Sequence, residues 1–415
     1  MKWLRFKFPF RVKSMLSAGS MLLVFLLSQI SVQAEQPVFV HYMPWYASKP
    51  VSGQWGWHWT MGHFNPDKLA GKGIREAATH DPPVIGLYDS NDPDVLECQV
   101  LLMKLAGIEG VIIDWYGITD FRDYGMVHRN TQHLVKFVKR AGLKFAICYE
   151  DQTLKHLVEG KQIPASQVMA QGKSVMGWLD EHWFGDDAYL QVDGKPLLLV
   201  FGPQYLNQSQ WNELRTGLKH SPLICGLPHL VQPAGLDGLF AWPPVSGGKT
   251  ITPEMWRKRL TEYYARAPQE TVISVAFPGF RDIYQQAGLH ASYGSIDARD
   301  GRTLQETLRL AADSKTPLIQ VATWNDYGEG TVVEPQAQGG YRNLEIIRSF
   351  IDARSPRKVT GTACDLRLPV LWYRLKKQYA GEQTVTAKLN EAAALLLAGD
   401  IEPARRILEE FALDE

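Results

Sequence analysis

The sequence has no excess of charge of either sign, because Lys and Arg together number 44 and so do Asp and Glu. A net charge of zero provides no broad basic surface for nucleic acid or an anionic membrane, and it favours a neutral partner.

Cysteine is scarce as well. The four cysteines form no Cys-x-x-Cys pair and are widely spaced, at Cys98, Cys148, Cys225 and Cys364. This spacing indicates neither a zinc site nor a disulfide framework, so we expect no metal.

Several catalytic and cofactor motifs are also missing. No glycine-rich phosphate loop follows a strand-like run, which leaves a nucleotide cofactor unsupported, and we expect no cofactor. The sequence contains no Gly-x-Ser-x-Gly elbow and no His-Glu-x-x-His helix. These absences argue against a serine hydrolase and against a zinc protease.

A long apolar run occurs only near the N-terminus. Basic residues precede an apolar run at 15–27, and Val32 and Ala34 fit a small-residue cleavage site. This arrangement is typical of a signal peptide at 1–34, although an uncleaved membrane anchor is the alternative. No later run reaches about 18 apolar residues, so we expect no stable membrane insertion after signal cleavage. The expected location is outside the cytoplasm, periplasmic or secreted.

The region 35–357 alternates short apolar, β-branched runs with helical patterns, which predicts βα units and a parallel sheet. Eight runs predict strands, at 38–42, 110–115, 144–149, 196–201, 222–226, 236–242, 272–277 and 317–324. Seven segments predict helices, at 94–106, 130–141, 166–179, 209–218, 253–265, 304–314 and 344–353. Eight such units fit an α/β fold of the (β/α)8 TIM-barrel type better than an open doubly wound sheet.

Residues 358–415 have a different pattern, with helical segments at 366–379, 385–398 and 402–411. We expect a small C-terminal helical appendix that packs against the barrel, and the sequence identifies no protein partner for it.

An acidic stretch at 89–94 precedes the first barrel helix. It lacks the glycine spacing of a calcium loop, and Asp92 with Pro93 is better explained as a helix N-cap and first helical residue.

Two carboxylates follow the last predicted strand, in the run 317–335. Asp326 and Glu329 would lie at the C-terminal mouth of the barrel, where catalytic residues of this fold gather. One protonated and one ionised carboxyl group are what glycosidic cleavage requires. Gly328 and Gly330 permit the tight turn that brings both side chains into one cleft. The alternative is that the two acids merely cap the next helix.

The segment WNDYGEGT at 324–331, followed by Glu334, resembles the Trp-Asn-Glu-Trp-x-Glu-Gly-Thr-x-x-Glu signature of glycoside hydrolase family 99, the endo-α-mannosidases. It also resembles the Trp-Asn-Asp-[Phe/Tyr]-Gly-Glu-Ser signature of family 71, the α-1,3-glucanases. HYMPWY at 41–46, YDS at 88–90 and GVIIDWYG at 110–117 also resemble the family 99 pattern. The resemblance covers 37–350 and leaves the appendix out.

The resemblance implies that Glu329 is the general acid/base. It implies that Asp326 is the carboxylate that, in family 99, deprotonates the sugar 2-hydroxyl, which then attacks the anomeric carbon to form a 1,2-anhydro intermediate. This position is normally Glu in family 99 and Asp in family 71, and Asp is shorter by one methylene. Asp326 could therefore instead position water for inversion of configuration.

Aromatic and polar side chains near the strand ends are candidates for stacking on sugar rings or bonding sugar hydroxyls. The long aromatic insertion after the first strand is expected to form part of the wall of the active-site cleft. The predicted binding residues are His41, Tyr42, Trp45, Tyr46, Trp57, Trp59, Asp114, Trp115, Tyr116, Glu150, Trp242, Trp324, Asn325, Tyr327 and Glu334, with Asp151 as a further candidate.

Two functions remain in competition. The first is hydrolysis of α-glycosidic bonds in a mannose- or glucose-containing oligo- or polysaccharide, with Asp326 and Glu329 as the carboxylate pair. The second is a catalytically silent carbohydrate-binding or scaffold protein on the same barrel, whose C-terminal helices recruit a partner. The intact carboxylate pair favours the enzyme, because a site that had lost its activity would have no physical reason to keep both groups.

Overall fold

The computed structural model describes residues 36–69, 73–354 and 359–412, and these belong to one compact unit that begins at Gln36. The predicted signal peptide at 1–34 and the expected domain boundary at 357 lie outside the described residues. Within the part of the chain that is described, no helix combines the length and the apolar character needed to cross a membrane.

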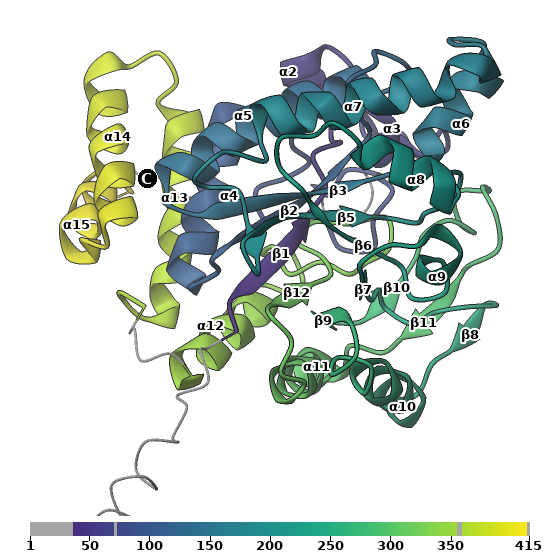
Figure 1. Ribbon diagram of the computed structural model, residues 1–415. Helices are drawn as coiled ribbons and strands as arrows, with labels where there is room; N and C mark the ends of the chain where they lie inside the picture. The colour runs from purple at the N-terminus through teal and green to yellow at the C-terminus, as the bar shows by residue number, and fades with distance from the viewer. Residues whose placement is uncertain (1–35, 70–72, 355–358, 413–415) are drawn as a thin grey trace, which may run out of the picture. The chain divides into compact units, whose positions relative to one another are not determined.

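The core is a closed ring of eight parallel strands at the centre of Figure 1. Each strand pairs with the next one in the ring, and the last pairs with the first, which closes the barrel. The ring consists of β1 (Val38–Tyr42), β2 (Gly110–Trp115), β3 (Lys144–Tyr149), β5 (Lys195–Val200), β6 (Leu223–Gly226), β7 (Gly238–Phe240), β9 (Thr271–Ala276) and β12 (Ile319–Val321). The predicted TIM barrel is confirmed, and all eight predicted strand segments overlap these strands.

The register of the first three strands determines which side chains enter the barrel. His41 on β1 lies opposite Ile112 on β2, and Asp114 on β2 lies opposite Cys148 on β3. Because residues two apart on a strand share a face, His41, Asp114 and Cys148 all point to the barrel interior. Their neighbours Tyr42 and Trp115 point outward, toward the helices.

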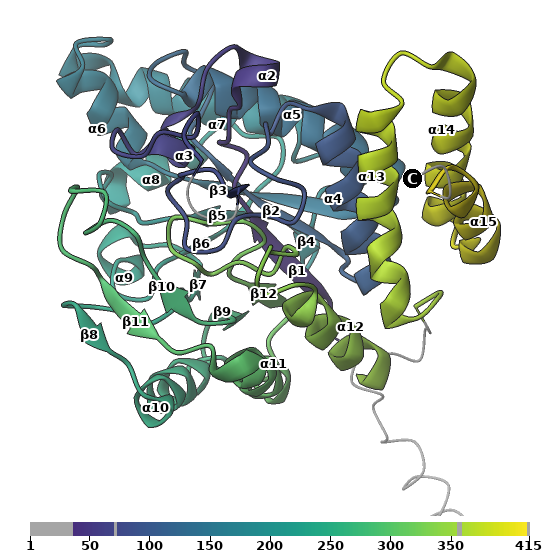
Figure 2. The same cartoon turned by 180° about the vertical axis from the view of Figure 1, so that it is seen from behind.

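A ring of helices covers the barrel, as Figures 1 and 2 show from opposite sides. The seven predicted helices correspond to α4 (Pro93–Ala106), α5 (Tyr124–Arg140), α7 (Val168–His182), α8 (Gln208–Arg215), α10 (Pro253–Tyr264), α11 (Arg302–Asp313) and α12 (Arg342–Arg354). The Asp92 carboxylate accepts the backbone N–H of Asp94 at 3.0 Å and Pro93 opens α4, so the predicted N-cap is confirmed. Helix α6 (Gln152–Glu159) was not predicted.

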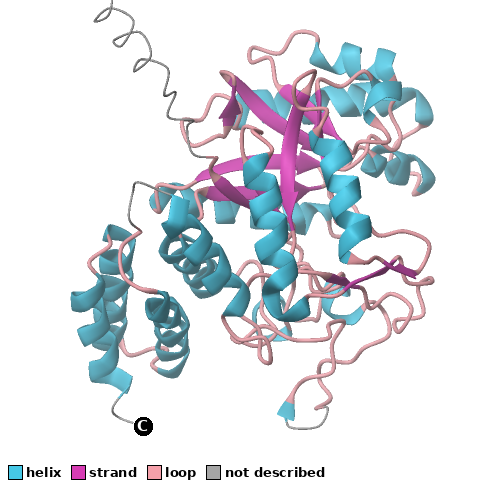
Figure 3. Cartoon of the chain, turned by 90° about the horizontal axis from the view of Figure 1, so that it is seen from below, coloured by secondary structure: helices cyan, strands magenta, loops and turns pink. Residues whose placement is uncertain are grey.

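Short elements that the sequence pattern did not predict surround the barrel mouth. In the long insertion after β1 lie α2 (Lys49–Ser52) and α3 (Trp57–Thr60), and α9 (Val231–Ala234) follows β6. β4 (Gln191–Val192) pairs antiparallel with β5. A separate small sheet contains β8 (Lys249–Thr250), β10 (Phe280–Arg281) and β11 (Gly294–Ile296), and Figure 3 shows it apart from the barrel strands. Strands of two or three residues are too short to carry a detectable alternation.

The C-terminal appendix consists of a 3-10 turn at Ala363–Arg367 and the helices α13 (Leu368–Gln378), α14 (Gln383–Ala398) and α15 (Ile401–Ala412). Helix α13 packs against α4 of the barrel and against α14 and α15, and α14 also contacts α4 (Figure 1). The Lys377 ammonium group contacts the Asp92 carboxylate at 2.8 Å and that of Asp94 at 2.7 Å. The indole of Trp372 donates to the carbonyl of Leu389 at 2.7 Å. The appendix therefore packs directly on the barrel's first long helix.

Candidate active site

A cavity of about 920 Å³ lies at the C-terminal mouth of the barrel. Its floor and walls come from residues at the ends of the strands or just after them, including His41 of β1, Asp114 of β2 and Asp326 after β12. Phe201 after β5 and Trp242 after β7 also line the cavity. This is the end of the barrel where enzymes of this fold bind their substrates.

The turn after β12 is fastened to the end of β1. The Asn325 side chain accepts the backbone N–H of Met43 at 2.8 Å and donates to the carbonyl of Met43 at 2.9 Å. The Tyr46 hydroxyl donates to the carbonyl of Asn325 at 2.8 Å. Gly330 has a φ of +67°, and a Cβ there would approach the carbonyl oxygen of Arg281 to 2.7 Å. Glycine is therefore required at Gly330 both for its backbone angle and for close packing.

Asp326 and Glu329 both border the cavity and have different surroundings. Burial raises the pKa of Asp326 to about 6, while the backbone N–H groups of Glu329 and Gly328 lower it. The N–H of Glu329 lies 3.0 Å from Asp326 Oδ1. Burial, and then the charge of Asp326, raise the pKa of Glu329 well above its usual value, although hydrogen bonds from Trp242 and Tyr284 lower it. The two carboxyls are thus placed to hold one proton between them near neutral pH, on Glu329.

Asp114 and Glu150 form a second carboxyl pair on the cavity wall. Burial, together with the charges of Glu150 and Asp326, raises the pKa of Asp114 well above its usual value. Burial raises the pKa of Glu150 to about 7, and a hydrogen bond from Gln152 lowers it. The cavity therefore holds four carboxyl groups in surroundings that favour their neutral forms.

Aromatic side chains form the rest of the walls. The Trp45 ring stacks on the His58 ring with centroids 4.0 Å apart, and His58 Nε2 lies 3.2 Å from the Asp123 carboxylate. The Trp242 ring meets the His41 ring edge-on at 4.8 Å, and its indole N–H donates to Glu329 Oε2 at 3.1 Å. Trp57 stands at the rim with 48% of its surface exposed. Flat apolar faces beside carboxyl groups suit a ligand with both CH faces and hydroxyls.

The cavity brings together ten of the residues expected from the sequence. These are His41, Trp45, Tyr46, Trp57, Asp114, Tyr116, Glu150, Trp242, Asp326 and Glu329. Seven other expected residues do not border it: Tyr42, Trp59, Trp115, Trp324, Asn325, Tyr327 and Glu334. Asp151 is also outside the cavity, since its carboxylate accepts the backbone N–H groups of 204–206.

For Tyr42 and Trp115, strand alternation explains why the structure differs from the expectation. Each follows a residue that faces the barrel interior, so each points to the helical layer. The Tyr42 hydroxyl donates to Gln99 of α4 at 2.5 Å, and the Trp115 indole donates to His128 of α5 at 3.1 Å. These two side chains are structural contacts between sheet and helices, and substrate contact is not expected of them.

The remaining five residues lie behind the cavity wall. Trp59 and Tyr327 pack in a buried aromatic cluster, with ring centroids 5.4 Å apart. Trp324 is fully buried, and Asn325 fastens the turn to β1. Glu334 is 3% exposed, and its carboxylate accepts hydrogen bonds from the side chains around it. These residues support the shape of the site from behind.

Three hydrogen bonds converge on the Glu334 carboxylate. The Tyr88 hydroxyl donates to it at 2.9 Å, the Tyr327 hydroxyl at 2.8 Å, and the Gln99 amide at 2.7 Å. Burial raises the pKa of Glu334 to about 7, and these hydrogen bonds lower it. The donors come from the insertion after β1, from α4 and from the β12 turn, so one side chain connects three segments of the wall.

Several cavity residues were not anticipated from the sequence. Tyr284 and Tyr293 come from the segment between β10 and β11, Phe201 follows β5, and His58 and Met61 lie in the insertion after β1. The position of Phe201 at a strand end could have identified it. Tyr284 and Tyr293 carry no sequence signal, because the small sheet that positions them could not be recognised.

Replacing Glu334 by Ala leaves three buried donors without their acceptor. Each unsatisfied buried group costs about 1–3 kcal/mol, so we expect the free energy of unfolding to fall by about 3 kcal/mol or more. Urea denaturation followed by fluorescence measures this change. The matched control is Glu181→Ala on the exposed surface of α7, which should leave the free energy of unfolding almost unchanged. Equal stability of the two variants would show that the three hydrogen bonds contribute nothing.

Comparison with known proteins identifies relatives of this architecture. WxcX of Xanthomonas campestris is 23% identical over 388 residues, which is 80% of this chain and 52% of WxcX. The chain thus spans about half the length of this curated relative. A glycoprotein endo-alpha-1,2-mannosidase-like protein of Danio rerio is 22% identical over 72% of this chain and 70% of its own length.

The fold also matches solved structures. The GH99 endo-alpha-mannosidase of Bacteroides thetaiotaomicron superposes with a TM-score of 0.57 at 18% identity, over 76% of this chain and 98% of that chain. A glycoside hydrolase-like protein gives a TM-score of 0.51 at 13% identity, over 77% of this chain and 95% of its own. The protein-family model of glycosyl hydrolase family 99 matches residues 33–348 of this chain. Because this match covers most of the 415 residues, the chain belongs to glycosyl hydrolase family 99.

Proposed function

We propose that the protein hydrolyses α-mannosidic bonds within a glycan, with Glu329 as general acid/base and Asp326 as the base that activates the attacking group. The observation that carries this proposal is the pair of carboxyls in one cavity with different proton affinities. Family membership supports glycoside hydrolysis, and the relatives described as endo-α-mannosidases support mannose as the sugar.

Glu329 suits the acid role because it keeps its proton. Its carboxyl is partly buried, faces the Asp326 carboxylate, and receives the Trp242 indole N–H on Oε2 at 3.1 Å. A protonated carboxyl can donate to the glycosidic oxygen as the bond to the anomeric carbon breaks, which makes the departing sugar a neutral alcohol. The resulting Glu329 carboxylate then takes a proton from water in the second step.

Asp326 suits the base role because backbone N–H groups stabilise its charge. In the proposed sequence it removes the proton of the sugar 2-hydroxyl, and that oxygen attacks the anomeric carbon while the leaving group departs. Water then opens the 1,2-anhydro ring, and the configuration at the anomeric carbon is retained. Direct attack by water would invert the configuration, so NMR of the first anomer released distinguishes the two routes.

The cavity suits an oligosaccharide better than a single sugar. Its volume of about 920 Å³ is near the upper end of ligand pockets, which span roughly 300–1,000 Å³. Trp45 and Trp242 line the cavity, and the more exposed Trp57 adds a third aromatic side chain to its lining. Sugar rings bound along this path would place a glycosidic bond beside Asp326 and Glu329.

Amide substitutions at the two carboxyls separate their roles. Glu329→Gln should lower kcat/KM on α-mannan by about 10²–10⁴-fold and spare kcat/KM for activated aryl α-mannosides, whose departure in the first step needs little protonation. Asp326→Asn should abolish the cleavage of both substrates, because the attacking group then lacks its base. Glu181→Gln on α7 is the control for a charge change far from the cavity. If either cavity variant retained full activity on the polymer at matched folding, the chemistry would lie elsewhere and a silent binding protein would be favoured.

The pH dependence of kcat/KM should be bell-shaped. Asp326 must be ionised, so activity is lost as pH falls through its pKa of about 6. Glu329 must be protonated, so activity is lost as pH rises through its raised pKa. The two limbs belong to the pair as a unit, because the groups interact. Glu329→Gln, assayed with an activated aryl α-mannoside, should keep the acid limb and lose the alkaline limb; an alkaline limb that persists contradicts the assignment.

We also propose that the protein is exported, on the basis of the basic and apolar segment at 1–34. Expression of the whole chain in a Gram-negative host, followed by N-terminal sequencing of the protein from the cell envelope and medium, tests this. The expected N-terminus is near Glu35. Recovery of only the unprocessed chain from the cytoplasm would refute export.

A further inference from the structure

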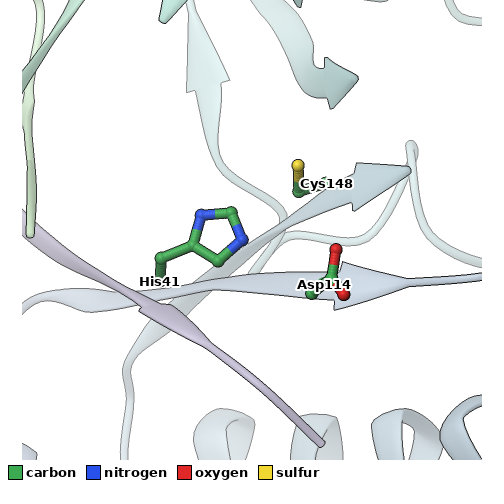
Figure 4. A group of neighbouring side chains, drawn as sticks. All are labelled: His41, Asp114 and Cys148. Atoms are coloured by element: carbon green, nitrogen blue, oxygen red, sulfur yellow. The ribbon is translucent and has the colours of Figure 1, made fainter. Parts of the chain in front are cut away.

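Three side chains of different chemistry converge in the barrel interior, from three successive strands. His41 comes from β1, Asp114 from β2 and Cys148 from β3, and Figure 4 shows them facing one another. One ligand-type atom of each lies within 4.8 Å of the others. All three are buried, with exposed fractions of 0%, 2% and 0%. His41 and Asp114 border the cavity, while Cys148 lies behind them.

The hydrogen bonds of His41 leave a lone pair available. The Gln320 amide nitrogen donates to the carbonyl of Ala241 at 3.1 Å, so the Gln320 carbonyl oxygen is the atom that faces His41 Nδ1, at 3.3 Å. Nδ1 therefore carries the ring proton and Nε2 is the acceptor. Nε2 is buried and has no hydrogen-bond partner. A histidine with one nitrogen fixed by an amide and the other free is the arrangement seen in metal ligands.

Asp114 also has an unused atom. Its Oδ2 is buried without a hydrogen-bond partner. The charges that act on this carboxyl most strongly are those of Glu150 and Asp326, which have the same sign as its own. Among the residues that the structure describes, Asp114, Glu150, Asp326 and Glu329 form no ion pair with Lys or Arg.

We propose that His41, Asp114 and Cys148 bind a borderline-soft divalent cation of the Zn²⁺ type, with a fourth coordination position open to the cavity. Imidazole nitrogen, carboxylate oxygen and thiolate sulfur are the ligands that Zn²⁺ uses, and three protein ligands with one open position are typical of its accessible sites. The site goes beyond the proposed glycoside hydrolysis and does not depend on it.

The chemistry of binding is consistent with the surroundings. The Cys148 thiol loses its proton to solvent when its sulfur becomes a ligand, and the thiolate and the Asp114 carboxylate together balance the charge of the cation. Bonds of about 2.0–2.3 Å would draw the three ligand atoms closer together than they lie now, by about 1 Å. Ca²⁺ and Mg²⁺ require six or more ligands, mainly oxygen, which this set does not supply.

Cobalt binding provides a direct optical test. The whole mature protein is prepared as Cys364→Ser, to remove the exposed thiol, then stripped with a chelator and titrated with Co²⁺ and Zn²⁺. We expect one ion per chain, a thiolate-to-cobalt charge-transfer band, and displacement of Co²⁺ by Zn²⁺. Absorbance and stoichiometry do not depend on glycan cleavage, so this test and the activity assays can fail separately.

Cys148→Ala tests the sulfur ligand, and Cys225→Ala is its matched control. Cys225 is equally buried and lies in the same layer, since Cys148 and Cys225 both pair with Leu199 of β5. Cys148→Ala should remove the charge-transfer band. It should also weaken Zn²⁺ binding by more than the roughly 10–100-fold that is typical when a residue that only supports a ligand is lost. Cys225→Ala should change neither the band nor the affinity. Absence of the band in Cys364→Ser protein, or its survival in Cys148→Ala, would overturn the proposal. If Cys148→Ala fails to fold, Asp114→Asn decides: weaker binding with the band retained supports the site, and unchanged affinity refutes it.

Discussion

The wall of the cavity depends on one buried carboxylate. Glu334 accepts hydrogen bonds from Tyr88, Gln99 and Tyr327, which belong to three segments far apart in the chain. A buried acceptor with three donors holds these segments in one arrangement, because displacing any of them would leave a donor unpaired. Because Tyr327 belongs to the turn that carries Asp326 and Glu329, this network holds the turn from behind.

Burial controls the electrostatics of the cavity. Four carboxyls face the same space, and in each case burial is the largest cause of a raised pKa. Backbone N–H groups lower the proton affinity of Asp326, whereas the charge of Asp326 raises that of Glu329. One site can thus offer an acid and a base at the same pH, as glycosidic cleavage requires. Deeper in the barrel, His41 and Asp114 each keep an unused atom beside Cys148.

The barrel strands were predictable, and the small elements at its mouth were not. Eight buried strands leave continuous β-branched runs separated by helical periods, and these patterns survive in a single sequence. The strands β8, β10 and β11 span two or three residues and form only through tertiary contact. Tyr284 and Tyr293 lie in the segment between β10 and β11 and border the cavity, so no local pattern could have identified them.

The sequence by itself determined the fold class, the end of the barrel that carries the site, and the presence of Asp326 and Glu329 there, because strand ends and motifs are local features. Only the tertiary structure decided which members of each motif face the cavity. His41 and Asp114 point inward while Tyr42 and Trp115 point outward, since consecutive residues of a strand alternate and the absolute phase is set by neighbouring strands. The proximity of His41, Asp114 and Cys148, which lie on three strands, likewise follows from the strand register. That register is set by pairing between segments far apart in the sequence.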